Sequence, residues 1–482
     1  MPADTQILIV VCVYLALLLG LGALAGRRTR SAEDFFLANR SLGAWVTAIS
    51  STASSESGWV VLGAVGMAYV DGVAALWLAP GCLMGYWVNL YVLAPRLRKV
   101  AADKGALTLP DCLVGLFGDR GHLLRGAACL VMLCCLAGYL AAQMTATGKA
   151  LQGVTGLDYG SGVWVGGAVI VVYTLLGGFR AVAWTDFVQG LIMVFALVLM
   201  PILALAAAGG YGATLDGLAR LDPNLVSLGA GKSGFALFGF LVGLLGIGLG
   251  YPGQPHVITR YMAAASDQKI RQTQVIGMVW GVLVFYGAGL LGLAGRLVMP
   301  ELGQPGGDPE QLFPLLARQS LPPLLAGLML AAVLSAIMST VSSQLLVAAS
   351  TVSRDILEGV FRLNRTGKAS VLAGRLAVLV LGILAMLVAS QDVRLVFWFV
   401  LFAWSGLGAA FGPVLLLGLF TRRLERVGAV AGMLTGFGVT IAWKATGLSD
   451  AVIYELVPAF FLAGLVALGV SAVRLRGRPG AA

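Results

Sequence analysis

Glu56 is the single residue of this sequence most suited to chemistry, because it places a carboxylate inside a long apolar run. A charged side chain at the centre of a membrane helix costs about 2.5–3.5 kcal/mol on insertion scales, so such a residue is a functional candidate by default. An ion, a proton or a substrate amine could face it. No Lys or Arg is expected within the same apolar core, which disfavours a purely structural ion pair.

A row of hydroxyls forms the second candidate. Ser335, Ser339, Ser342 and Ser343 follow i, i+4, i+7, i+8 spacing and share one face of a helix, with Thr340 beside them. Hydroxyl, carbonyl and carboxylate oxygens are the ligands that hard cations prefer. Helix packing is the alternative, because Ser and Thr often join membrane helices.

Two apolar segments carry helix breaks. Residues 53–58 read Ala-Ser-Ser-Glu-Ser-Gly, and residues 248–255 hold two prolines and three glycines, which cannot maintain a regular helix. Unwound backbone inside a bilayer is tolerated only where protein groups or a water-filled cavity supply hydrogen-bond partners for its amides and carbonyls. The two breaks together predict a binding site rather than two ordinary kinks.

The composition places these features in a membrane protein. Of 482 residues, 59% are hydrophobic and only 11% are charged, against about 25% charged in a soluble domain. The 66 glycines suit closely packed membrane helices. Six cysteines show no metal-type spacing with histidine, and no P-loop, dinucleotide fingerprint or nucleophile–histidine pair is present. We therefore expect neither an enzyme nor an organic cofactor.

The apolar runs predict an all-α polytopic protein with about thirteen transmembrane helices. The expected spans are 5–25, 43–70, 73–95, 123–148, 160–178, 183–208, 236–261, 272–297, 321–350, 370–389, 393–419, 427–444 and 452–473. The broken spans lie five apart and cross in opposite senses, as in a five-helix inverted repeat. The predicted units are 1–42 (first peripheral helix and basic loop), 43–210 (first repeat), 211–235 (extracytoplasmic loop), 236–420 (second repeat) and 421–482 (two peripheral helices and tail).

The basic residues predict the orientation. With the N-terminus outside, only Lys149, Arg220, Lys232, Arg296, Arg318, Arg394 and Lys444 of the 32 Lys and Arg residues fall on the outer side. The inner loops hold the rest, including Arg260. This asymmetry predicts an outer N-terminus and a cytoplasmic C-terminus in a bacterial inner membrane, and it explains the net charge of +10 without nucleic acid.

Three more side chains are candidates within the apolar runs. Asp186 lies near the inner end of the sixth span, where helix N-capping is an equally good explanation. Tyr139 and Tyr251 are candidate pocket aromatics, although a membrane Tyr often anchors at the interface.

In several of these segments the chain resembles the sodium/solute symporter family, most closely its sodium/proline symporter branch. The segments that carry the resemblance are Asn39–Gly43, Ser57–Trp59, Ala106–Asp111, Trp184–Asp186, Gly250–His256 and Met338–Leu346. They occur in order over nearly the whole chain. The resemblance implies a thirteen-helix architecture with a LeuT-type 5+5 inverted-repeat core.

The resemblance also implies roles for particular residues. The sodium site would use backbone carbonyls of Ala53, Glu56 and Ala336 and the hydroxyls of Ser339 and Thr340. The substrate would contact Ser57, Gly58, Tyr139, Tyr251 and Pro255. A second sodium site would use Asp186 with Ser339, Ser342 and Ser343. Arg40 and Ser55 would take part in coupling.

Three positions depart from the branch. It usually has an aspartate where Ser55 stands, an uncharged residue where Glu56 stands and a pocket tryptophan where Ile247 stands. On a regular helix, moving the carboxylate by one position rotates it by about 100°.

The sequence thus predicts a Na⁺-coupled symporter of a small amino acid or similar zwitterion, with L-proline as the first candidate. One alternative is a sodium- or proton-coupled symporter of another small solute, with Glu56 as the coupling or amine-binding carboxylate. Another is a transporter-like membrane sensor, which the eight residues after Arg474 disfavour. The expected partners are Na⁺, the zwitterion and the lipid bilayer, with no nucleic acid and no obligate protein partner.

Overall fold

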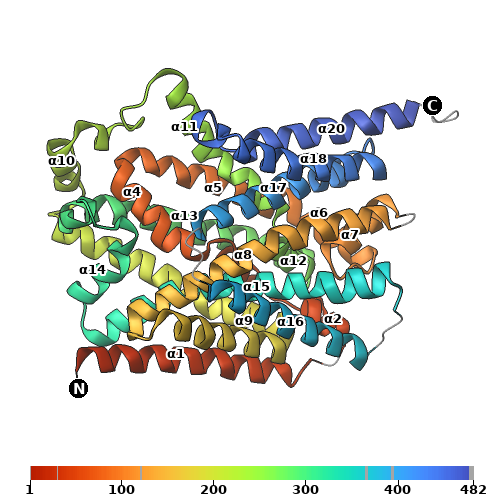
Figure 1. Cartoon of the computed structure of the whole chain (residues 1–482), viewed down its shortest axis with the longest axis horizontal. Coiled ribbons are helices and arrows are strands. Elements are labelled where there is room, and N and C mark those ends of the chain that lie inside the picture. The colour runs from red at the N-terminus through yellow and green to blue at the C-terminus, as the bar shows by residue number, and fades with distance from the viewer. Residues whose placement is uncertain (1, 30, 120–121, 364–366, 392–395, 477–482) are drawn as a thin grey trace.

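The structure, a computed structural model, describes residues 2–29, 31–119, 122–363, 367–391 and 396–476. All its regular elements within these ranges are helices, and the one β-bridge joins Leu42 to Ala264. Most long helices run along the longest axis of the molecule, and the start of the first helix and the end of the last helix lie at opposite ends of that axis (Figure 1).

Long α-helices alternate along the chain with shorter 3-10 and π segments. The α-helices are α1 (Ala3–Gly26), α2 (Ala32–Leu37), α3 (Ala44–Ser55), α4 (Val65–Asp71), α5 (Leu78–Trp87), α6 (Ala94–Asp103), α7 (Leu109–Phe117), α8 (Leu123–Thr155), α9 (Tyr159–Ala207), α10 (Tyr211–Leu221), α11 (Gly234–Gly246), α12 (Pro255–Met262), α13 (Asp267–Val298), α14 (Leu312–Ser320), α15 (Pro323–Ser350), α16 (Lys368–Ala389), α17 (Val396–Phe420), α18 (Arg426–Ala445), α19 (Leu448–Ala451) and α20 (Leu456–Arg476). The 3-10 and π segments are η1 (Ala38–Arg40), η2 (Trp59–Ala64), η3 (Gly72–Trp77), η4 (Val88–Leu93), η5 (Pro223–Val226), η6 (Ile247–Gly253), η7 (Pro300–Gly303), η8 (Pro309–Gln311) and η9 (Thr351–Val360).

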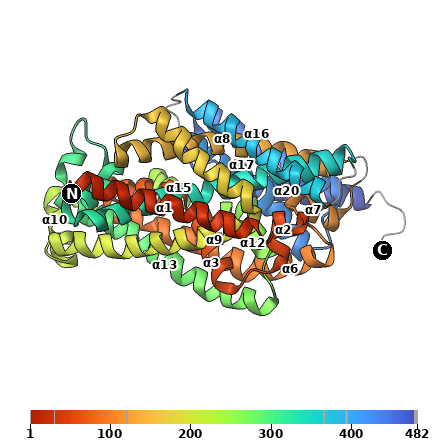
Figure 2. The same cartoon turned by 90° about the horizontal axis from the view of Figure 1, so that it is seen from below.

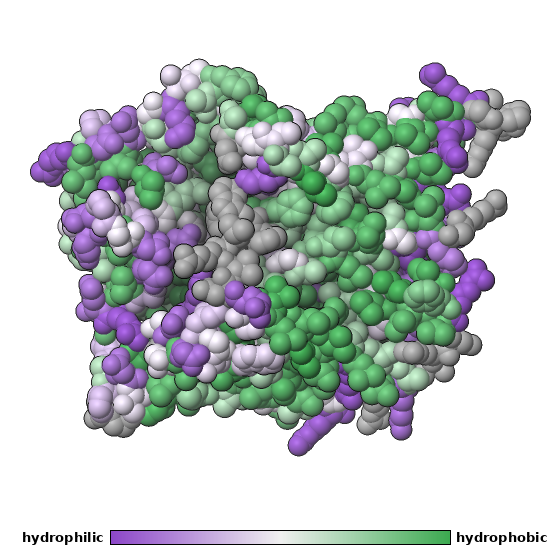
Figure 3. Space-filling view, in the orientation of Figure 1, coloured by the Kyte–Doolittle hydropathy of each residue, from purple (hydrophilic) through white to green (hydrophobic). Residues whose placement is uncertain are grey.

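On the face that Figure 3 shows, an apolar belt covers the middle of the molecule, and hydrophilic side chains gather towards both ends of its long axis. Within the described residues, eleven helical runs are long and apolar enough to cross a membrane. The multi-pass character predicted from composition is therefore confirmed.

Two of these eleven runs contain a chain reversal. Gly178, at φ 54° and ψ −143°, divides α9 into a segment that packs along α1 and a segment that packs along α13. Helices α1 and α13 point in opposite directions (Figure 1). Gly72, at φ 64°, turns the chain between α4 and the run that contains α5 and α6. A reversal divides one run into two possible crossings, so these two reversals are compatible with thirteen crossings. The count itself stays a prediction.

Both predicted helix breaks are confirmed. Helix α3 ends at Ser55, Ser57 has φ 22°, and the chain resumes as the π segment η2. The second break is the 3-10 segment η6 followed by Gln254 in an extended conformation, before α12 begins at Pro255. Pro252 and the glycines around it explain this break, because proline lacks an amide donor and glycine destabilises a helix.

The two broken helices meet at the end of the molecule that carries most of the basic residues. There the amide of Leu42 donates to the carbonyl of Ala263, and the amide of Ala265 donates to the carbonyl of Leu42. The start of the first broken helix is thus tied to the end of the second, so the two run in opposite directions, as the inverted repeat requires. Seen from below, α3 lies beside α12 and α13 (Figure 2), whereas α11 lies at the edge of the molecule (Figure 1), where Phe235 and Phe238 are exposed.

Some predictions fall outside the described residues. These are the positions of Arg30, Arg120, Arg365, Arg394 and Arg478, the first residues of the predicted span 393–419, and the end of the tail. The division into units 1–42, 43–210, 211–235, 236–420 and 421–482 also stays a prediction.

We predict that Gly178→Ala destabilises the fold. An added Cβ would lie 2.5 Å from the carbonyl oxygen of Phe35, in a backbone conformation that only glycine adopts readily. We expect the free energy of unfolding to fall by about 2–4 kcal/mol. The measurement heats the protein in detergent and records the temperature at which half of it remains monodisperse, which should be lower in the variant. Gly438→Ala on α18, where a Cβ meets nothing within 4 Å, is the control and should be neutral or slightly stabilising. Equal midpoints for the two variants would contradict the reversal at Gly178.

Candidate functional site

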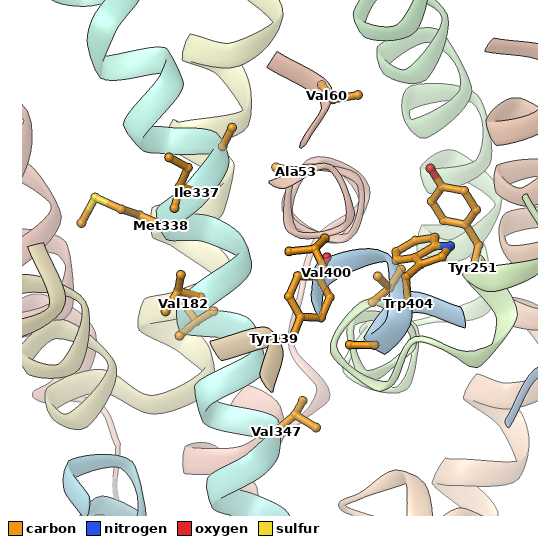
Figure 4. Packing of buried hydrophobic residues seen from close by; sticks show 14 of the residues in the cluster. Ala53, Val60, Tyr139, Val182, Tyr251, Ile337, Met338, Val347, Val400 and Trp404 are labelled. Atoms are coloured by element: carbon orange, nitrogen blue, oxygen red, sulfur yellow. The ribbon is translucent and has the colours of Figure 1, made fainter. Parts of the chain in front are cut away.

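The hydroxyls of α15 contact the unwound end of α3 directly. Ser339 Oγ donates to the Ala53 carbonyl at 3.1 Å, and Thr340 Oγ1 lies 3.1 Å from the Ser54 carbonyl. The Ser57 amide donates to Thr340 Oγ1 at 3.1 Å. The turn of chain that carries Ala53 lies between α15 and the side chains of Tyr251 and Trp404 (Figure 4). We call this contact the α3–α15 seam.

The seam brings together four of the five predicted sodium ligands. The Ala336 carbonyl accepts from both Ser339 and Thr340 within α15, next to the carbonyl of Ala53. The backbone carbonyl of Glu56 instead accepts from the Val60 amide at 3.3 Å, in the turn that follows the break. A cluster of carbonyl and hydroxyl oxygens with no lipid exposure fits a hard cation, and the sodium role of these residues stays a prediction.

The Glu56 carboxylate is buried in a cluster of hydroxyls. Its Oε1 lies 2.6 Å from the Tyr86 hydroxyl, 2.9 Å from the Tyr251 hydroxyl and 2.8 Å from Ser55 Oγ. These hydroxyls come from three different helical runs, so the carboxylate joins α3, α5 and η6. Among the described residues, no Lys, Arg or His forms an ion pair with it.

The expected 100° rotation of the carboxylate does not apply here. It assumes a regular helix through position 56, whereas α3 ends at Ser55 and Glu56 adopts φ −99° and ψ 2°. Because the helix has ended, the side chains of Ser55 and Glu56 converge rather than diverge. Ser55, predicted to act in coupling, contacts the displaced carboxylate directly.

A small cavity lies against Glu56. Its volume of about 20 Å³ holds on the order of one water molecule. The lining residues are Ser55, Glu56, Ser57, Trp59, Tyr139, Ile247, Tyr251, Val400, Leu401 and Trp404. Of the predicted substrate residues, Ser57, Tyr139 and Tyr251 therefore line it, whereas Gly58 lines a neighbouring hollow and Pro255 is buried in α12 away from both.

The neighbouring hollow opens toward the less basic end of the molecule. It has a volume of about 390 Å³ and a rim that carries Lys149, Asp308 and Glu310. We call it the vestibule. Trp59 and Val400 line both the vestibule and the small cavity, so these two side chains lie between them. The position of Val400 above Tyr139 is visible in Figure 4.

Trp404 supplies an indole to the cavity that Ile247 lines. Its Nε1 donates to the Ile247 carbonyl at 3.2 Å, and its ring meets that of Tyr251 edge to face at 4.8 Å between centroids. Ile247 stands where the proline branch usually has a tryptophan. The cavity nevertheless contains an indole, because Trp404 of α17 contributes one.

Asp186 faces a buried arginine, which sequence reasoning had assigned to an inner loop. Arg260 is fully buried in α12, and its Nη2 lies 2.9 Å from Asp186 Oδ2. Ser50 and Ser343 also donate to the same carboxylate oxygen. Arg260 is therefore a buried helix residue and not a loop residue, and Asp186 caps no helix because it lies within α9.

The buried pair constrains the predicted second sodium site. Arg260 also contacts Ser343, so its guanidinium lies where Asp186 and Ser343 would share an ion. Ser342 donates to the Ser339 carbonyl within α15. The site stays a prediction, and an ion there would have to displace the guanidinium from Asp186.

Arg40 closes the basic end of the broken-helix pair. It has φ 49°, and its guanidinium donates to the Met262 carbonyl at 3.2 Å and to the Ala106 carbonyl at 2.8 Å. It also pairs with Glu33 at 3.1 Å. A residue predicted to take part in coupling thus ties α12 to the segment before α7.

Sequence reasoning missed Tyr86, Arg260 and Trp404. A Tyr or Trp in an apolar run usually signals a membrane interface, so neither aromatic residue was distinguishable from an anchor. Arg260 carried a usable signal, since it follows the second break by only five residues and still lies within the predicted span 236–261.

The comparisons with known proteins agree over most of the chain. The model of the sodium:solute symporter family matches residues 35–436. The chain is 40% identical to the high-affinity proline transporter PutP of Bacillus subtilis, over 91% of this chain and 92% of that protein. It is 37% identical to the sodium/proline symporter of Escherichia coli, over 96% of this chain and 92% of that protein.

Solved structures confirm the fold. A Na⁺-coupled sialic acid symporter in a substrate-bound, outward-open state superposes with a TM-score of 0.81 at 21% identity, covering 97% of this chain and 98% of that one. A nucleobase-cation-symport-1 family transporter in a closed conformation gives a TM-score of 0.57 at 17% identity, covering 92% of this chain and 95% of that one. At these identities the likeness concerns the fold, which is the predicted LeuT-type core.

We predict strong energetic coupling between Asp186 and Arg260. Asp186→Asn or Arg260→Gln alone leaves one buried charge unpaired, which costs about 3–5 kcal/mol. The double variant should lose clearly less than the sum, measured by a double-mutant cycle on thermal unfolding in detergent. The partly exposed pair Arg98–Asp267 is the control, where the coupling energy between the two removals should be about 1 kcal/mol or less. Additive losses at Asp186 and Arg260 within about 0.5 kcal/mol would contradict the pair.

Proposed function

The chain belongs to the sodium:solute symporter family, and we propose that it imports L-proline together with Na⁺ by alternating access. Two curated relatives, at 37% and 40% identity over more than nine tenths of the chain, are proline transporters by name. The family consists of transporters, so the chain is a multi-pass transport protein of the plasma membrane and not an enzyme.

The observation that carries the sodium part is the α3–α15 seam. Hydroxyls of Ser339 and Thr340 meet carbonyls of Ala53 and Ser54 at 3.1 Å across two helices that belong to different halves of the chain. A cation bound among Ala53, Glu56, Ala336, Ser339 and Thr340 would join the same two helices. Its binding would therefore favour whichever arrangement holds them together.

The proposed substrate site lies on the other side of the same break. Ser57 contributes its amide to Thr340 and its side chain to the cavity, so a single residue touches both sites. Ser57, Gly58, Tyr139, Tyr251 and Pro255 are the proposed substrate residues. A substrate and a sodium ion that both favour one arrangement of the break stabilise each other's binding, and this effect is reciprocal.

The two ends of the molecule differ in the way that alternating access requires. The basic end is closed by Arg40, by the Leu42–Ala264 bridge and by the Asp186–Arg260 pair. The other end has the vestibule, which reaches Trp59 and Val400 above the cavity. We propose that the basic end is cytoplasmic, with the N-terminus outside a bacterial inner membrane and the C-terminus inside.

Two alternatives give different outcomes in a transport experiment. Glu56 could titrate, which would make this a proton-coupled or mixed-ion symporter of proline or another small solute. A transporter-like sensor would bind the same ligands without net transport.

We predict uptake of labelled L-proline into proteoliposomes driven by a sodium gradient alone. An inward proton gradient without sodium should give no accumulation above equilibrium. Accumulation with the proton gradient alone would contradict sodium coupling and favour the titrating Glu56. Sodium-dependent binding without accumulation would contradict transport and favour the sensor.

We predict that Thr340→Val raises the sodium concentration for half-maximal uptake about 10- to 100-fold. Valine has the same shape but removes an oxygen ligand, and one interaction with a charged group contributes about 1.5–3 kcal/mol. Thr440→Val is the matched control, because Thr440 is also buried and bonded to its own helix, in the peripheral α18. An unchanged sodium requirement in Thr340→Val would contradict the seam as the ion site.

A further inference from the structure

A further hollow lies at the basic end of the molecule, beside the Leu42–Ala264 bridge. Its volume is about 940 Å³, which is in the size range of ligand sites, and it shares no lining residue with the small cavity or the vestibule. Its walls are the first turns of α3 and α13 and, from α9, Trp184. These three helices pack against one another, and α3 is seen beside α13 in Figure 2. We call this hollow the tryptophan groove.

The charged side chains of the groove are cations. Lys269 and Arg271 come from the first turns of α13, and no Asp or Glu lines the groove within the described residues. The carboxylate of the same turn, Asp267, lies outside the lining and pairs with Arg98. In the part of the chain that the structure describes, Lys269 and Arg271 form no ion pair, and Lys269 Nζ donates to the amide oxygen of Gln272 at 3.3 Å. Two cationic side chains that only donate hydrogen bonds are suited to an anion.

Two exposed tryptophans place the groove at the surface of the membrane. Trp45 of α3 is 61% exposed and Trp184 of α9 is 45% exposed, and both line the groove. Indole rings favour the level of the lipid headgroups, where the ring contacts hydrocarbon and its N–H meets polar groups. At this level the anion that a membrane supplies is the phosphate of a phospholipid.

The face of α13 that borders the groove continues as an apolar stripe. Val279, Val282 and Tyr286 are exposed and share this face with Val275, which lines the groove. From Val275 to Tyr286 the helix rises about 16 Å, close to half of the ~30 Å hydrocarbon core of a bilayer. The stripe therefore begins at the groove and has the length of one leaflet.

A second apolar stripe runs along α9. Leu191 and Phe195 are exposed and share one helix face with Trp184. The indole of Trp280 on α13 donates to the Gly190 carbonyl of α9 at 3.0 Å, so the two helices remain in contact beyond the groove. An acyl chain can lie along these stripes while its headgroup occupies the groove, whereas a free phosphate would make no use of them.

We propose that the tryptophan groove binds an anionic phospholipid, with its phosphate at Lys269 and Arg271, its glycerol beside Trp45 and Trp184 and an acyl chain along α13. The site goes beyond the proposed function, because its occupancy requires neither Na⁺ nor a transported solute. The bound lipid contacts α3, α9 and α13 together, at the point where the first broken helix begins.

Native mass spectrometry of the purified full chain in detergent tests this site. The protein is titrated with dioleoyl phosphatidylglycerol or with dioleoyl phosphatidylcholine, in the absence of Na⁺ and proline. Each Lys or Arg near a membrane surface contributes about a 5-fold preference for anionic lipid, so the first phosphatidylglycerol should bind about 25-fold more tightly than the first phosphatidylcholine. Equal affinities for the two lipids in the wild type would overturn the proposal, whatever the variants do.

The variant arm removes both cations of the groove. Lys269→Gln combined with Arg271→Gln should weaken phosphatidylglycerol about 25-fold and leave phosphatidylcholine unchanged, so that the preference is lost. Arg422→Gln combined with Arg423→Gln is the matched control, because it removes the same charge from two exposed arginines outside the groove. This control should keep the wild-type preference.

The remaining outcomes identify other causes of anion binding. An equal loss of preference in the two double variants would show a general attraction to the basic residues, and it would overturn the site. Inorganic phosphate and sn-glycerol 3-phosphate in large molar excess should leave the bound phosphatidylglycerol in place, because neither can use the apolar stripes. Displacement by either compound would show that the groove recognises a free phosphate and would overturn the lipid assignment.

Discussion

The contact between α15 and the end of α3 determines the rest of the site. Unwound backbone within the apolar belt has to find hydrogen-bond partners in the protein, since lipid offers none. The hydroxyls of Ser339 and Thr340 supply them to Ala53, Ser54 and Ser57. The groups that stabilise the break in lipid are the same oxygens that suit a hard cation, so the stability of the break and the proposed ion site have one physical origin.

Ionisable side chains buried in the protein are held in two ways. Asp186 and Arg260 pair with each other, and Ser50 and Ser343 add hydrogen bonds to the carboxylate. Glu56 has only hydroxyl partners among the described residues. The first arrangement joins α9 and α12 to α3 and α15. The second joins α3, α5 and η6 through one carboxylate oxygen at the helix break.

Access to the cavity depends on few side chains at either end. Among the described residues, only Trp59 and Val400 line both the cavity and the vestibule. At the basic end, contacts between separate helices, which include those of Arg40 and the Leu42–Ala264 bridge, close the molecule. Opening that end requires Arg40 and the Leu42–Ala264 bridge to release α12. Ligands that bind across the α3–α15 seam can shift this equilibrium only to the extent that they prefer one state.

Local composition and helical periodicity were enough to predict the membrane character, the two helix breaks, the hydroxyl face of α15 and the buried position of the Glu56 carboxylate. They could not place Arg260 or show that Tyr86, Tyr251 and Trp404 converge, because those residues are distant along the chain and meet only through packing. The sequence-based reasoning also assumed a regular helix at Glu56, where the tertiary contacts of the break bring Ser55 and Glu56 together. The partners of each buried charge are set by long-range geometry, which a spacing along the chain does not contain.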